Sequence, residues 1–258
     1  EPRQPPTEGL DARQLGNIYH RIFEQLYRAV DLDANGPPAA LEGLQKALPQ
    51  VAKQVLDAAP RREQFRETAW WEETRQEIEG NVARSLEALE SLDERFRFHR
   101  AEQSFGIKGE PGLPLEVRDD GGDTFRLCGY IDRVDRADGD RVRIIDYKTG
   151  GPYAYTDRAV REGRKLQLPL YALAAQEALG LGEVVDGFYW HVQHAEASGF
   201  TLAKFGPGAA MATAVAYAWE AVRGARRGYF VPKPPDGGCP GYCPAAGFCW
   251  QYEARGWG

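Results

Sequence analysis

The 258-residue sequence contains no run of about 18 apolar residues, so none of its segments is a candidate for a membrane-spanning helix. Methionine occurs once and cysteine four times, and so few cysteines cannot hold a chain of this length as a disulfide-stapled fold. Neither a secretory leader nor a G-x-x-x-x-G-K-S/T phosphate-binding loop is found. These absences argue against a membrane protein, a secreted protein and a P-loop ATPase, and we expect a cytoplasmic protein without a membrane partner.

Hydrophobic residues make up 43% of the sequence and charged residues 27%, as in ordinary globular proteins. A chain of this length can bury most of its apolar surface in one core, so we expect a single domain over residues 1–258. The net charge is −6, with −7 on residues 1–150 and +1 on residues 151–258. The total does not indicate a nucleic-acid partner, but a local basic stripe would suffice for one. Because the chain opens on Glu1 in a proline-rich segment, we expect it to be part of a longer protein.

The first part of the chain, about residues 10–100, has a sequence pattern typical of helices. Leu10–Val30 carries apolar residues on one face at helical spacing, and Asp11 is the predicted N-cap. Ala39–Arg97 is rich in good helix formers, with interruptions expected at Pro60 and at Gly80–Asn81. This pattern predicts a helical insertion over Ala39–Arg97.

From residue 101 onward the sequence changes to short alternating apolar runs separated by glycines, which predict strands. The predicted strands are Glu102–Ile107, Leu113–Arg118, Thr124–Arg136, Arg141–Lys148 and Val184–Gln193. The predicted helices after them are Gly163–Ala178 and Pro207–Arg226, followed by an irregular cysteine-rich tail over residues 229–258. The pattern therefore predicts an α/β fold, a mixed central sheet flanked by helices, over about residues 101–228.

Two acidic residues stand inside strands that are otherwise apolar. Asp132 lies in the run Gly129–Asp135, and Asp146 ends an isoleucine-rich run. A buried carboxylate is costly unless it is paired, and a divalent cation would pair it. Asp146 and Lys148 are two residues apart on one strand, so they would set an ammonium group beside a carboxylate-held metal. That arrangement is typical of phosphodiester cleavage with Mg²⁺.

Asp132 and Asp146 can share a face of the sheet only if the turn between their strands has the right length. A two-residue loop, Asp138–Gly139, would pair Asp132 with Ile145 and point the two aspartates to opposite faces. A shared metal site therefore requires a three-residue loop, such as Asp138–Asp140, or a β-bulge.

Motifs spread over nearly the whole chain resemble those of one nuclease family. They are Gly16–His20, Glu102 with Phe105–Gly106, Gly129–Asp135, Asp146–Lys148, Gln167 with Tyr171, and the C-terminal cysteines. In this order and spacing they resemble the PD-(D/E)XK nuclease superfamily, in particular its RecB-like exonuclease branch with the AddB C-terminal nuclease domains and the CRISPR-associated iron-sulfur exonucleases. The resemblance implies a restriction-endonuclease-like fold and a DNA exonuclease of recombination or repair that uses Mg²⁺ or Mn²⁺.

The resemblance also implies roles for individual residues. His20, Asp132, Asp146 and the main-chain carbonyl of Tyr147 would bind the metal; Asp132, Asp146 and Lys148 would be catalytic; and Gln167 and Tyr171 would support the site and the DNA. Asp135 and Glu102 are expected in structural or supporting roles.

Each of these roles has a simpler alternative. A helical histidine such as His20 is more often a surface or core residue than a ligand. Asp146 and Lys148 could form an ordinary ion pair, and Asp132 could pair with Arg133 or Arg136.

Gln167 and Tyr171 share a helix face only if the helix has begun by Gln167, with Pro169 in its first turn. Otherwise simple helix packing explains them equally well.

Three of the four cysteines cluster near the C-terminus as Cys239, Cys243 and Cys249, which is typical of a metal or cluster site. The resemblance implies a 4Fe-4S cluster, with zinc, free thiols or a disulfide as alternatives. The first spacing is one residue longer than is usual in the iron-sulfur nucleases. A fourth ligand would lie upstream of Glu1 or be Cys128, which is itself expected to pack in a strand as a small hydrophobe.

Two basic runs could bind phosphates, although a solvated helix face explains such runs equally well. They are Arg158, Arg161, Arg164 and Lys165, and Arg223, Arg226 and Arg227. The resemblance implies DNA as a partner and a helicase domain or subunit in a larger helicase-nuclease protein. The alternatives are a non-catalytic DNA-binding module of the same fold and a structural subunit that docks a partner through its tail.

Overall fold

The computed structural model describes residues 7–29, 41–93, 95–232, 238–239, 243 and 245–252. The chain divides into two compact units, Glu1–Val215 and Ala216–Gly258. None of the helices in the described ranges combines the length and the apolar character that a membrane span needs.

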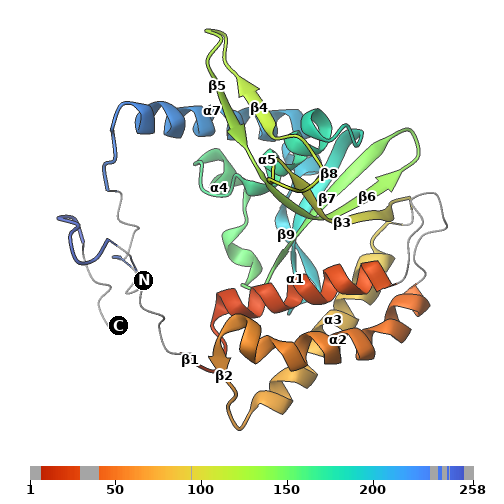
Figure 1. Cartoon of the computed structure of the whole chain (residues 1–258). Helices are drawn as coiled ribbons and strands as arrows, with labels where there is room; N and C mark the ends of the chain where they lie inside the picture. The colour runs from red at the N-terminus through yellow and green to blue at the C-terminus, as the bar shows by residue number, and fades with distance from the viewer. Residues whose placement is uncertain are drawn as a thin grey trace. The chain divides into compact units, whose positions relative to one another are not determined.

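Three helices form a layer beside the sheet of the first unit (Figure 1): α1 (Ala12–Ala29), α2 (Leu41–Glu63) and α3 (Trp71–Ser91). The N-cap prediction for α1 is confirmed, because the carboxylate of Asp11 accepts the amide of Gln14 at 2.7 Å. The side chain of Gln14 accepts the amide of Asp11 at 2.7 Å in return, which completes a reciprocal cap. The apolar face of α1 is buried, including Ile18, Ile22 and Leu26, and the short strands β1 (Thr7–Glu8) and β2 (Phe65–Arg66) pair in parallel.

The helix interruptions expected at Pro60 and at Gly80–Asn81 do not occur. Pro60 lies in the last turn of α2, which continues to Glu63, and α3 runs through Gly80–Asn81. The buried side chain of Asn81 donates a hydrogen bond to the hydroxyl of Tyr19 at 2.7 Å. This tertiary contact outweighs the weak helix propensity of the pair.

The central sheet has five strands in the order β3-β6-β7-β8-β9. Their bounds are β3 (Arg97–Phe105), β6 (Gly129–Ala137), β7 (Arg141–Lys148), β8 (Glu183–His191) and β9 (Glu196–Thr201). β7 and β8 are parallel and the other neighbours antiparallel, so the predicted mixed sheet is confirmed. The connection from β7 to β8 contains η1 (Pro152–Ala154), α4 (Asp157–Arg161), α5 (Gln167–Leu173) and the π-helical η2 (Ala174–Ala178). After β9 follow α6 (Leu202–Phe205) and α7 (Pro207–Arg226).

The prediction of one strand over Thr124–Arg136 is wrong. β5 (Thr124–Leu127) pairs with β4 (Leu115–Arg118) in a separate two-stranded sheet, whereas β6 belongs to the central sheet. Cys128 lies between β5 and β6 and is exposed, so its prediction as a packed strand residue is also wrong. The physical reason is that the chain leaves one sheet and enters another at this point, which an alternating apolar run does not reveal.

β7 directs alternate side chains to two different layers, as expected for a strand. Ile145 and Tyr147 belong to the core that the sheet shares with α1, α2 and α3. Asp146 and Lys148 project to the opposite side. On β8, the hydroxyl of Tyr189 accepts the amide of Leu168 in α5 at 3.2 Å. Asp146 and Lys148 therefore lie on the side of the sheet where α5 packs.

Candidate active site

The turn between β6 and β7 has three residues, Asp138–Asp140, because Ala137 pairs with Arg141. Its second and third residues have positive φ of 73° and 55°, of the kind that such loops use. The same register, continued along the hairpin, sets Asp132 opposite Asp146. The requirement for a three-residue loop is confirmed, and both aspartates face the same side of the sheet.

A third acidic residue lies at the same level of the sheet. The pairing of β3 with β6 on either side of Glu102 places this residue opposite Asp132. Glu102 has a φ of 45°, which is uncommon for a residue with a side chain. Glu102, Asp132 and Asp146 thus form a row of carboxylates across three adjacent strands. The sequence indicated only a supporting role for Glu102, because strand register is not visible in a single sequence.

His20 on α1 lies against this row. Its Nδ1 atom lies 3.3 Å from a carboxylate oxygen of Glu102 and 3.4 Å from one of Asp132. Each of the three residues offers a ligand atom, and these atoms all lie within 4.8 Å of one another. An imidazole with two carboxylates is a donor set suited to a divalent cation. The amide of Tyr147 donates to the second oxygen of Asp132 at 2.7 Å, which brings the main chain of Tyr147 to the same place.

Asp146 supplies an independent reason to expect a cation. It is fully buried, and its partner is the ammonium group of Lys148. That ammonium group lies against Oδ2, whereas within the described residues Oδ1 has no hydrogen-bond partner. A buried oxygen without a hydrogen bond is costly, and a metal ion would satisfy it. The residues present therefore fit a divalent cation, although Asp146 does not belong to the close group formed by His20, Glu102 and Asp132.

The pKa values of these groups show the same excess of negative charge. Burial raises the pKa of Asp146, and the charge of Asp132 raises it further, to about 7 despite Lys148. Burial lowers the pKa of His20, but Asp132 and Glu102 outweigh burial and hold that pKa well above 6.5. Burial also raises the pKa of Glu102. Without a cation, the site takes up protons to balance its carboxylates.

A chain of hydrogen bonds holds the lysine. The ammonium group of Lys148 donates to the side-chain oxygen of Gln167 at 3.0 Å, and the amide nitrogen of Gln167 donates to the hydroxyl of Tyr171 at 3.0 Å. α5 begins at Gln167, so Pro169 lies in the first turn and the two side chains share a helix face, as the sequence required. The structure thus brings Lys148, Gln167 and Tyr171 together beside Asp146.

Comparison with known proteins agrees with this geometry. The family model of the PD-(D/E)XK nuclease superfamily matches residues 2–250. The chain belongs to the PD-(D/E)XK nuclease superfamily. This confirms the resemblance that the motifs indicated.

Relatives of this PD-(D/E)XK chain include two proteins named as subunits of an ATP-dependent helicase/deoxyribonuclease. That of Staphylococcus haemolyticus (strain JCSC1435) is 27% identical over 206 residues, 71% of this chain and 17% of the relative. That of Moorella thermoacetica (strain ATCC 39073 / JCM 9320) is 34% identical over 146 residues, 53% of this chain and 12% of the relative. The exonuclease/helicase subunit RexB of Lactococcus lactis subsp. cremoris (strain MG1363) is 28% identical over 181 residues, 70% of this chain and 15% of the relative. The chain therefore spans only a small part of the length of these relatives.

Asp135 has a different role in this PD-(D/E)XK domain. Its carboxylate is fully buried and lies 2.6 Å from both Arg133 and Arg143. The structural role predicted for it is confirmed. Arg133 therefore pairs with Asp135 and not with Asp132, and Arg136 pairs with Asp140 in the hairpin turn. The alternative in which Asp132 pairs with one of these arginines does not hold.

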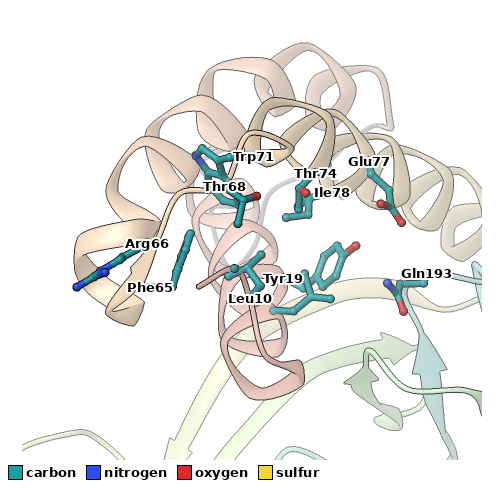
Figure 2. A pocket seen from close by; sticks show the side chains of 12 residues that line it. Leu10, Tyr19, Phe65, Arg66, Thr68, Trp71, Thr74, Glu77, Ile78 and Gln193 are labelled. Atoms are coloured by element: carbon teal, nitrogen blue, oxygen red, sulfur yellow. The ribbon is translucent and has the colours of Figure 1, made fainter. Parts of the chain in front are cut away.

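Two hollows lie along α1, and only one of them borders the site. An open cleft of about 820 Å³ is lined by His20 and Glu102 among others, and it gives the candidate metal ligands access to solvent. A smaller pocket of about 240 Å³ lies within the helical layer, where Phe65, Trp71 and Glu77 surround it (Figure 2). None of the residues that line the smaller pocket was predicted for the site.

The cysteine trio belongs to the second unit, Ala216–Gly258. Cys239 is buried, Cys243 and Cys249 are half-buried, and none of the three forms a disulfide. The metal-binding group found among the described residues is that of His20, Glu102 and Asp132, which contains none of the cysteines. The 4Fe-4S cluster therefore stays a prediction.

Proposed function

We propose that this chain is the metal-dependent DNA nuclease domain of a larger helicase-nuclease protein, and that it degrades DNA as an exonuclease in recombination or repair. The observation that carries the proposal is the position of Asp146. Its buried carboxylate contacts Lys148 and lies on the same side of the sheet as Asp132, next to which Glu102 stands in the row of carboxylates. The names of the relatives, which include deoxyribonuclease, exonuclease and helicase, support DNA as the substrate and a helicase as the partner.

The ligands for Mg²⁺ or Mn²⁺ would be His20, Glu102, Asp132, Asp146 and the main-chain carbonyl of Tyr147. Most of these donors are oxygens, which both hard cations prefer. When bound, such a cation offsets the charge of the phosphate and makes water a better nucleophile at neutral pH.

Lys148 contributes as an ammonium group. Burial lowers its pKa, but Asp146 and Asp132 outweigh burial and raise that pKa above 10.5, so the group keeps its proton at neutral pH. It is therefore suited to neutralise the phosphate and to orient the attacking water, not to act as a base. Gln167 fixes the direction of the ammonium group, and Tyr171 fixes Gln167.

The decisive test is cleavage of end-labelled linear single-stranded and duplex DNA with Mg²⁺ or Mn²⁺. We expect Asp146→Ala and Lys148→Ala each to lose at least about 100-fold in rate. Lys108→Ala, at an exposed position outside the site, is the control and should cleave like the parent. A folded parent protein that binds DNA but cuts nothing with either metal would favour the non-catalytic binding module.

A 4Fe-4S cluster at Cys239, Cys243 and Cys249, or zinc in its place, is a separate part of the proposal. Its support is the spacing of the cysteines and the resemblance to iron-sulfur nucleases. Iron, sulfide and zinc content of anaerobically purified protein tests it. The metal should disappear in Cys243→Ser, and protein with none of these elements would contradict it.

A further inference from the structure

Two tyrosine rings, those of Tyr189 and Tyr155, lie between the ammonium groups of Lys148 and Lys165. The Lys148 ammonium lies 5.6 Å from the centre of the Tyr189 ring, whose centre lies 4.4 Å from that of Tyr155. On Tyr155 sits a second ammonium group, that of Lys165, 4.4 Å from the ring centre. Such contacts hold a cation in place without neutralising its charge.

The backbone of Lys165 is hydrogen-bonded to one of these tyrosines. The hydroxyl of Tyr189 donates to the carbonyl of Lys165 at 3.3 Å and accepts the amide of Leu168 at 3.2 Å. One tyrosine therefore positions Lys165 and the start of α5, which carries Gln167. The main chain of Lys165 is thereby held next to the start of α5.

In the described part of the chain, Lys165 differs from Arg158 and Arg164 in having no acidic partner. Arg158 and Arg164 both pair with Glu162, whereas Lys165 forms no ion pair among the described residues. The side chain of Lys165 is half-buried, and no carboxylate in the described part of the chain neutralises its ammonium group. In a site for phosphodiesters, its partner would be a phosphate next to the one at Lys148.

Tyr153, two residues before Tyr155 in the chain, offers an exposed aromatic ring. It lies in η1, five residues after Lys148, and its side chain is 92% exposed. A tyrosine side chain that is so exposed to solvent contributes little to the hydrophobic core. Nucleotide bases stack readily on exposed aromatic rings, and single-strand binding sites combine such rings with cations along the backbone.

We propose that Tyr153 and Lys165 form a single-strand platform, on which Lys165 binds a phosphate adjacent to the scissile one and Tyr153 stacks on a base. The proposal rests on the proposed function, because it names the form of the substrate at the same site. In duplex DNA the base faces are already stacked on one another, so Tyr153 has a partner only in a single strand. The platform therefore favours single-stranded DNA.

The test measures binding of fluorescent single-stranded and duplex DNA by anisotropy in the presence of a chelator, so that cleavage does not interfere. We expect Tyr153→Ala to bind the single strand about tenfold more weakly, with little change for the duplex. We expect Lys165→Ala to reduce the slope of log affinity against log salt by about 0.7 on the single strand, the value for one lost phosphate contact. A role limited to folding would not change that slope.

Matched controls are Trp70→Ala, at another exposed aromatic residue, and Lys108→Ala, at another exposed lysine. Both should bind like the parent. Unchanged single-strand binding in Tyr153→Ala and Lys165→Ala overturns the platform, even if the parent protein cleaves DNA with Mg²⁺. Weakened single-strand binding in these variants supports the platform even if the parent cuts nothing, an outcome that would reject only the nuclease activity.

Discussion

At the scale of single residues, the carboxylates of this domain fall into two groups with opposite electrostatics. Asp135 is neutralised by two arginines. Glu102, Asp132 and Asp146 form no ion pair with an arginine in the described part of the chain, and their partners are His20 and Lys148. Carboxylates left with excess charge attract a cation, whereas neutralised ones hold strands together. The group of three is therefore suited to chemistry, and Asp135 to stability.

The role of Glu102 can be tested by removing its charge alone. We expect Glu102→Gln to bind Mn²⁺ at least about tenfold more weakly, because one anionic ligand of the group is lost. Isothermal titration calorimetry measures this affinity. Glu110→Gln is the control, because Glu110 lines the same cleft but accepts a hydrogen bond from Tyr130 at 2.7 Å. Equal affinities in the two variants would remove Glu102 from the ligands.

Asp135 makes a prediction about stability and pH. Burial raises its pKa, but Arg133 and Arg143 outweigh burial and lower it below 3.8. A folded-state pKa below the unfolded value means that the carboxylate stabilises the fold above about pH 4 and that this contribution is lost as the pH falls through the folded pKa. We expect Asp135→Asn to lower the free energy of unfolding by about 3–5 kcal/mol at neutral pH, since it leaves buried arginines unpaired.

Urea unfolding of the parent and of Asp135→Asn, at neutral pH and near pH 3, measures this difference. The loss should be smaller at the acidic pH, because near pH 3 Asp135 of the unfolded parent binds a proton and part of the stabilisation by the ionised carboxylate is already lost. An equal loss at both pH values would contradict the ionised pairing of Asp135.

At the scale of elements, the β6–β7 hairpin determines which residues can meet. Its three-residue turn places Asp132 opposite Asp146, and the neighbouring strand β3 adds Glu102. One residue more or less in the turn would send every side chain of one strand to the other face. The site is thus a consequence of register as much as of residue type.

Deleting Gly139 tests this dependence. The shortened turn shifts the register by one, so we expect cleavage to fall by at least about 100-fold while circular dichroism retains the secondary structure. Gly139→Ala is the matched control: its φ of 73° costs an alanine about 1–2 kcal/mol, but a Cβ there meets no atom within 4 Å and the register is kept. A deletion variant as active as Gly139→Ala would contradict a shared site for the two aspartates.

At the scale of the whole molecule, every candidate ligand for Mg²⁺ or Mn²⁺ lies in the first unit, Glu1–Val215, and the cysteine trio lies in the second. Compact units of a chain can keep their own structure when another unit is changed. We therefore expect the triple variant Cys239→Ser, Cys243→Ser, Cys249→Ser to retain cleavage within about twofold of the parent. Cleavage assays paired with iron analysis measure this. A folded triple variant without activity would place the cysteines in the catalytic function.

Much of the architecture was predictable because it depends on local patterns. Helical spacing and a cap identified α1, and alternation identified β7 to its observed ends. The order and spacing of several motifs together identified the family. The sequence also indicated which length the β6–β7 turn must have if Asp132 and Asp146 are to share a metal site, since a change of one residue in the strand register would send the two aspartates to opposite faces.

What only the tertiary structure decided depends on pairing between distant segments. The place of Glu102 beside His20, the separate β4–β5 sheet, the exposed Cys128 and the edge strand β9 all follow from which strand lies next to which. The continuity of α3 through Asn81 follows from its contact with Tyr19. Long-range contacts contribute more free energy than local helix and strand propensities, so they decide which segments become neighbours. The residue types in the sequence therefore indicated the chemistry of the site, whereas the tertiary structure brought the candidate metal ligands together.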